Sequence, residues 1–147
     1  RLAGCNMWDG RPETQAASEC PFCDTDFYKG DKMTAFEIVE QIKNLPGRAK
    51  WVTLSGGEPA LQLAKDASLI TALHEAGYLI AIETNGTVEL PDGFDHVTLS
   101  PKQPLVSLGE QLHKEQWQSN TEMTLQWLYD EPDWKLSAQV HKYLGVE

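Results

Sequence analysis

The chain has 147 residues, 12 basic and 22 acidic, so its formal net charge at pH 7 is −10. Its length corresponds to about one domain and its 41% of apolar residues suffice for a hydrophobic core, which argues against disorder. The acidic balance argues against direct binding of nucleic acid, and no apolar run approaches the roughly 20 residues of a membrane span, so we expect a cytoplasmic protein with no membrane partner.

The three cysteines lie close together near the start of the chain. Residues Arg1–Ala3 are typical of a strand end, and Cys5, Cys20 and Cys23 follow, with no cysteine beyond them. An odd, clustered set does not suit a disulfide framework. The residues leave three alternatives open: a structural zinc site, one disulfide with a remaining thiol, or buried inert thiols.

The middle of the chain alternates predicted helices and strands, which favours an α/β fold with parallel strands. Thr34 and Glu37 form a capping box, which predicts a helix from about Ala35 to Asn44. A second helix is predicted to end at Ala76, before Gly77. The strands predicted in this region are Trp51–Leu54, Leu79–Glu83 and Val97–Leu99.

Each of these strands leads into a loop rich in glycine or polar residues. The loops contain Gly56-Gly57, then Thr84–Thr87, then Ser100–Lys102, and we expect a positive φ at Asn85 or Gly86. In parallel α/β folds ligands bind at the carboxyl ends of the strands. We therefore expect the functional residues to gather at one edge of the sheet.

The last part of the chain is predicted to contain one helix and one strand. Ser119 or Asn120 can cap a helix that runs through Tyr129. Trp134–Gln139 is typical of a final strand. With Arg1–Ala3, the predicted strands number five.

The cysteine spacing and several later motifs carry a resemblance to a known family. Three thiolates are one fewer than hold an ordinary [4Fe–4S] cluster, as in radical S-adenosylmethionine enzymes, although C-x14-C-x2-C is wider than the common C-x3-C-x2-C spacing. The chain nevertheless resembles the 7-carboxy-7-deazaguanine synthases, some of which carry this enlarged loop. The matching segments, in order, are 1–8, 20–27, 55–59, 82–86, 100–102 and 134–144.

The resemblance implies a fold and an activity. The implied fold is a single radical S-adenosylmethionine domain over residues 1–147, an incomplete parallel (β/α) barrel that lacks an N-terminal strand and a segment between about 103 and 119. The implied activity is a lyase of queuosine biosynthesis. It converts 6-carboxy-5,6,7,8-tetrahydropterin to 7-carboxy-7-deazaguanine with loss of ammonia, through a 5′-deoxyadenosyl radical. A reductant such as flavodoxin and a homodimer are implied as partners.

The resemblance also implies the site residues, with no catalytic side chain beyond the cluster and the radical. Cys5, Cys20 and Cys23 would hold the [4Fe–4S] cluster, and zinc is disfavoured because no histidine lies near them. Thr25 would help to bind Mg²⁺, and Arg1, Gly57 and His141 would contact the substrate. The residues expected at S-adenosylmethionine are Gly56, Gly57, Glu58, Glu83, Thr84, Asn85, Ser100 and Lys102.

Structural roles and other functions compete with these assignments. The glycine pair can be an ordinary strand-to-helix turn, Thr25 a capping residue, and His141 a structural histidine. The alternative functions are another radical S-adenosylmethionine enzyme, such as a glycyl-radical activase, and a non-catalytic zinc module.

Overall fold

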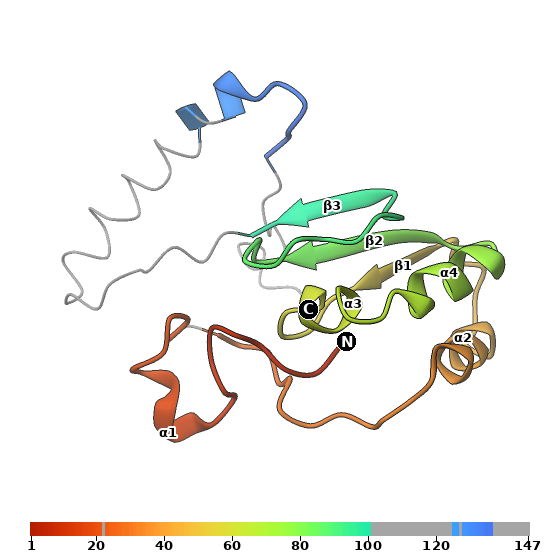
Figure 1. Ribbon diagram of the computed structural model, residues 1–147, viewed down its shortest axis with the longest axis horizontal. Helices are drawn as coiled ribbons and strands as arrows, with labels where there is room; N and C mark the ends of the chain where they lie inside the picture. Colours follow the sequence, from red (N-terminus) through yellow and green to blue (C-terminus); the bar gives the residue numbers. More distant parts are fainter. Residues whose placement is uncertain (22, 101–124, 127, 137–147) are drawn as a thin grey trace. The chain divides into compact units, whose positions relative to one another are not determined.

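The computed structural model describes residues 1–21, 23–100, 125–126 and 128–136 (Figure 1). The chain divides into two compact units, Arg1–Pro104 and Leu105–Glu147. The expectation of one domain over residues 1–147 stays a prediction.

A three-stranded parallel sheet forms the centre of the first unit. Its strands are β1 (Trp51–Leu54), β2 (Leu79–Thr84) and β3 (His96–Leu99), paired in the order β1-β2-β3. The strands lie side by side and point the same way (Figure 1). The predicted α/β class is therefore confirmed, and within the described residues the sheet is open rather than a closed barrel.

Three helices form the hydrophobic core together with this sheet. They are α2 (Ala35–Lys43), α3 (Ala60–Leu63) and α4 (Ser68–Glu75). Helix α4 packs on β2, and the other two helices pack against α4. Leu54 pairs with Ile82 and Ile82 with Val97, so these side chains share the covered face. The buried residues of this core are Val39, Leu54, Leu63, Leu69, Ile70, Leu73, Ile80 and Ile82.

The helix boundaries follow the local signals in the sequence. The Thr34 side chain accepts a hydrogen bond from the Glu37 amide, and the Glu37 carboxylate accepts one from the Thr34 amide at 2.7 Å. Helix α2 therefore begins where the capping box predicts. Helix α4 ends at Glu75, two residues before Gly77. The amide of Thr34 and then its hydroxyl lower the pKa of Glu37.

The opposite face of the sheet is more exposed and more polar. Thr53 pairs with Ala81, and Glu83 pairs with Thr98, so these side chains alternate with the core residues along the strands. Thr53 and Glu83 are exposed. The carboxyl half of this face therefore presents hydroxyl and carboxylate groups instead of the apolar run of a strand that is buried on both sides.

Three segments differ from the expectations. The strand predicted at Arg1–Ala3 is only an isolated parallel bridge between Leu2 and Gly56. A four-residue helix, α1 (Pro12–Gln15), was not predicted, because one turn with a single proline at its start is too short for a periodic signal.

The third difference lies in the second unit. Residues 125–126 and 128–130 are helical, so the predicted helix through Tyr129 extends to Asp130, and its start lies outside the described residues. Trp134, Lys135 and Leu136 are not in a strand, contrary to the expectation for Trp134–Gln139. The Trp134 amide donates to the Glu131 carbonyl at 3.1 Å, which closes a turn instead of a strand ladder. Residues 137–139 lie outside the described part.

The part of the chain that the structure describes contains no helix long and apolar enough to cross a membrane.

The capping box gives a testable prediction about stability. We expect Thr34→Ala to lower the free energy of unfolding by about 1 kcal/mol, because the Glu37 amide loses its acceptor. The control is Thr71→Ala, at an exposed position of α4, which should leave the free energy of unfolding unchanged or raise it slightly. Urea unfolding followed by circular dichroism measures both, and equal effects of the two variants would contradict a capping role.

Candidate active site

The carboxyl ends of the three strands meet at one edge of the sheet, as the sequence predicts. Strand β1 leads into residues 55–58, β2 into residues 85–87, and β3 into Ser100. The Ser100 amide donates to the Thr84 carbonyl at 2.8 Å, which holds the end of β3 against the end of β2. We refer to these strand ends and the loops that follow them as the carboxyl edge.

The segment that carries the first cysteine lies directly against the loop after β1. The Leu2 amide donates to the Ser55 carbonyl at 2.7 Å, the Gly57 amide to the Leu2 carbonyl at 3.1 Å, and the Glu58 amide to the Gly4 carbonyl at 2.8 Å. The first two bonds form the isolated parallel bridge between Leu2 and Gly56, and the third extends the backbone contact to Gly4. They place Cys5 at the carboxyl edge.

The two glycines make this close approach possible. A Cβ atom at Gly56 would lie 2.1 Å from the Leu2 carbonyl oxygen, and one at Gly57 would lie 2.0 Å from that of Gly4. Gly56 also has a φ of 145°, which other residues rarely adopt. The glycine pair is thus more than an ordinary turn, because it accommodates the backbone of the cysteine segment.

Glu58 is completely buried and joins two loops of the carboxyl edge. Its Oε1 accepts hydrogen bonds from the Thr84 hydroxyl at 2.8 Å and from the Ala60 amide at 3.1 Å. Its Oε2 accepts one from the Asn85 amide at 2.6 Å. With 0% exposure, this side chain has three hydrogen-bond donors, as buried polar oxygens require. Glu58 therefore links the end of β1 to the end of β2.

A second polar link connects the cysteine segment to the loop after β2. The Asn6 side chain donates to the Thr87 hydroxyl at 2.8 Å and accepts from the Asn85 side chain at 3.1 Å. Asn85 in turn accepts from the Thr87 amide at 2.9 Å. The sequence singled out Asn85 but not Asn6 or Thr87; the position of Asn6 directly after Cys5 was the available signal. As expected for this turn, Gly86 has a positive φ, 77°.

Glu83 differs from Glu58 in its surroundings. It lies on the exposed face of the sheet, and one of its oxygens accepts a hydrogen bond from the Ser55 hydroxyl at 2.9 Å. This pair joins the ends of β1 and β2 on the side away from the helices. Glu83 thus remains accessible to a ligand in a way that Glu58 does not.

The three cysteines are thiols rather than disulfides. Cys20 is buried, whereas Cys5 and Cys23 are half-buried. The Cys23 amide donates to the Cys20 carbonyl at 3.1 Å, so these two residues share one turn, and the Met7 amide points to the Cys5 sulfur at 3.5 Å. This donor set, three thiols with an amide directed at one sulfur, suits an iron–sulfur cluster.

The three thiol side chains do not surround a common centre. Within the described ranges, no group of three or more His, Cys, Asp or Glu side chains is placed to hold a metal ion. The backbone thus brings the first cysteine to the carboxyl edge and the other two into one turn.

The remaining predicted site residues are placed as follows. Thr25 is half-buried, with its hydroxyl 3.5 Å from an Asp24 oxygen, and Arg1 is exposed. Lys102 and His141 lie outside the described residues.

Comparison with known proteins identifies relatives of this chain. Residues 17–109 match the Radical SAM superfamily. The chain is 34% identical to a 7-carboxy-7-deazaguanine synthase of Caulobacter vibrioides and 37% identical to one of Burkholderia multivorans, with 99% of the chain and 87% of each relative covered. A third such synthase, from Nitratidesulfovibrio vulgaris, is 36% identical, with 99% and 88% covered. These alignments extend over 185 to 191 positions, so the relatives contain internal residues without a counterpart here.

The close approach at Gly57 is testable. We expect Gly57→Ala to destabilise the first unit by about 1–3 kcal/mol and to remove the protection of the Glu58 amide from hydrogen exchange, because the methyl group would collide with the Gly4 carbonyl. The matched control is Gly30→Ala, whose methyl group would meet only the Ala3 side chain, at 3.1 Å. An unchanged exchange rate at Glu58 in Gly57→Ala would contradict the proposed docking of the segment.

The buried carboxylate gives another prediction. We expect Glu58→Gln to lower the free energy of unfolding by about 1–3 kcal/mol, because an NH2 group would replace one of the two accepting oxygens and face donors. Glu89→Gln, at an exposed position, makes the same chemical change and should have no effect. Thermal unfolding compares the two, and a stable Glu58→Gln protein would show that the carboxylate does not hold the loops.

Proposed function

The chain belongs to the radical SAM superfamily and, within it, to the 7-carboxy-7-deazaguanine synthases, and from this membership we propose the reaction that it catalyses. The proposed reaction converts 6-carboxy-5,6,7,8-tetrahydropterin to 7-carboxy-7-deazaguanine with loss of ammonia, as a lyase step of queuosine biosynthesis. The observation that carries the proposal is the docking of the Cys5 segment on the loop 55–58 at the carboxyl edge.

The cysteines are the proposed ligands of the [4Fe–4S] cluster that membership in the superfamily implies. Cys5, Cys20 and Cys23 would hold three irons and leave the fourth for S-adenosylmethionine. When bound, the cluster and the nucleotide together supply a 5′-deoxyadenosyl radical. The chain contributes three thiolates on a backbone that is already held, and their side chains would turn toward a common centre.

We place S-adenosylmethionine at the carboxyl edge. The supporting observation is that the expected contact residues converge there from the ends of all three strands. Among them Glu83 is exposed, with one oxygen engaged by Ser55, so its carboxylate can accept from ribose hydroxyls. The full proposed set is Gly56, Gly57, Glu58, Glu83, Thr84, Asn85, Ser100 and Lys102.

The substrate and a magnesium ion would bind beside this position. Thr25 follows Cys23 by two residues, so its hydroxyl oxygen would lie next to the cluster, and oxygen ligands suit Mg²⁺. Arg1 would pair with the substrate carboxylate through its planar guanidinium group. Gly57 and His141 complete the proposed substrate contacts.

The partners are part of the same proposal. A reductant such as flavodoxin would supply the electron, the active form would be a homodimer, and the protein would act in the cytoplasm on a small molecule. The net charge of −10 supports the expectation of no direct contact with nucleic acid. The comparisons favour this synthase activity over a glycyl-radical activase and over a zinc module.

Anaerobic reconstitution tests the proposal. We expect about four irons per chain and an EPR signal of the reduced protein that changes when S-adenosylmethionine is added, because the open iron binds the nucleotide. Added 6-carboxytetrahydropterin should then yield 7-carboxy-7-deazaguanine. Cys23→Ser should lose the iron and the product, whereas Ser68→Ala, at the start of α4, should retain both.

Two results would contradict the proposal. A colourless protein with one tightly bound zinc ion would favour the zinc module. A cluster that responds to S-adenosylmethionine but yields no deazaguanine product would mean a different radical reaction.

A further inference from the structure

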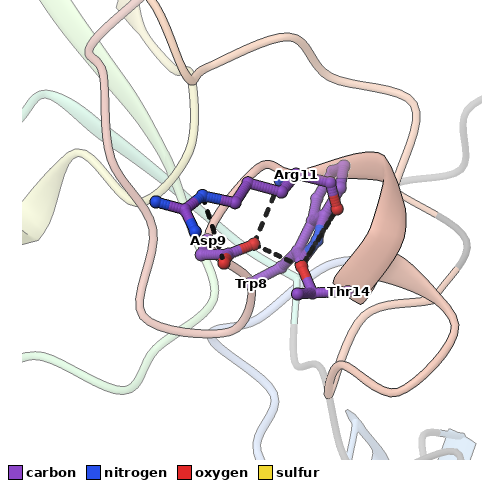
Figure 2. Close-up of polar contacts among 4 residues, drawn as sticks. All are labelled: Trp8, Asp9, Arg11 and Thr14. Carbon is purple, nitrogen blue, oxygen red and sulfur yellow. Dashed lines mark hydrogen bonds and ion pairs between the residues drawn. The ribbon is translucent and has the colours of Figure 1, made fainter.

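The insertion between Cys5 and Cys20 is folded around the carboxylate of Asp9 (Figure 2). One Asp9 oxygen accepts hydrogen bonds from the Arg11 amide, at 3.0 Å, and from the Thr14 hydroxyl. The other oxygen lies 3.8 Å from the Arg11 guanidinium. The Thr14 hydroxyl, followed by the Arg11 amide, lowers the pKa of Asp9, so the carboxylate is ionised at neutral pH. The insertion is thus an ordered turn rather than a loose connection.

Trp8 attaches this turn to the chain that follows the cysteines. Its indole N–H lies 3.1 Å from both the Arg11 carbonyl and the Thr14 hydroxyl, as Figure 2 shows. Its ring meets the buried Phe27 ring edge-on, with centroids 5.5 Å apart. The Phe27 carbonyl in turn accepts from the Gly4 amide at 3.1 Å. The insertion therefore packs against Phe27, which follows the last cysteine and is hydrogen-bonded to Gly4, directly before the first.

Helix α1 (Pro12–Gln15) contributes Thr14 to this turn and ends at Gln15, which is connected to both later cysteines. The Gln15 side chain donates to the Cys23 carbonyl at 2.7 Å. The Gln15 carbonyl accepts from the Ser18 hydroxyl at 2.7 Å, and the oxygen of that hydroxyl accepts from the Cys20 amide at 3.2 Å. Thus Gln15 is connected to Cys23 directly and to Cys20 through Ser18.

We propose that Gln15 is a positioning residue for the iron–sulfur ligands, presented to the Cys20–Cys23 turn by the Asp9-centred fold of the insertion. An unstructured 14-residue loop would leave the first cysteine and the other two free to move apart. The hydrogen bonds of the insertion remove that freedom before any cluster binds. The inference rests on the proposed function, since the cluster is the group that these cysteines would hold.

The decisive experiment measures cysteine reactivity in the chain without a cluster. Gln15→Met removes the donor while it keeps the length, neutrality and helix preference of the side chain. We expect iodoacetamide to alkylate Cys23 about five-fold faster, the effect of one lost hydrogen bond, with Cys5 unchanged, as measured by peptide mass spectrometry. The matched control is Gln41→Met on the exposed side of α2, which should leave every rate unchanged. An unchanged Cys23 rate in Gln15→Met would overturn the proposal.

A second variant tests the role of the Asp9-centred turn. Thr14→Val removes the hydroxyl that Asp9 and Trp8 contact, and we expect it to accelerate alkylation of Cys23 as well. If Cys23 is alkylated faster in Gln15→Met but not in Thr14→Val, the Asp9-centred turn does not help to position Gln15.

Iron release separates this inference from the proposed function. In the reconstituted protein, Gln15→Met should lose iron to a chelator about five-fold faster than the parent chain and the Gln41→Met control. A parent chain that takes up no iron would contradict the proposed function, while the alkylation rates would still decide whether Gln15 holds the Cys20–Cys23 turn.

Discussion

The closeness of two backbones, the segment 2–5 and the loop 55–58, is the constraint on which the carboxyl edge depends. Three backbone hydrogen bonds of 2.7 to 3.1 Å join them. The approach is so close that a side chain at Gly56 or Gly57 would collide with a carbonyl oxygen. The Gln62 side chain adds a bond to the Ala3 carbonyl at 2.6 Å. The position of Cys5 is therefore set by main-chain pairing, which tolerates little displacement.

The polar residues of the carboxyl edge divide into those that hold the loops and those that remain accessible. Glu58 is buried and engaged by three protein donors, and Asn6 pairs with Asn85 and Thr87. Glu83 is exposed on the open face of the sheet. The Gly-Gly-Glu run thus has a structural role in joining β1, β2 and the cysteine segment, beside the cofactor contact predicted for it.

Local signals account for most of the fold that the sequence predicted. Helix α2 begins at its capping box, whose residues are close together in the chain. Strand β1 spans Trp51–Leu54 as predicted, because its apolar residues form a local pattern, although its pairing partner is β2. The expected strand at Arg1–Ala3 is reduced to one bridge, and α1 was missed. Both depend on partners elsewhere: the pairing of Leu2 requires Gly56, and α1 is held through Gln15 and Cys23.

By itself, the sequence determined the family, the three thiols and the clustering of polar loops at the strand ends. These features are short motifs whose order and spacing can be recognised without coordinates. Only the tertiary structure decided that Glu58 turns inward to Thr84 and Asn85, and that Asn6 meets Asn85, 79 residues away. These contacts depend on burial and on hydrogen-bond donors that the parallel sheet brings together from distant parts of the chain. Local sequence patterns carry no information about either.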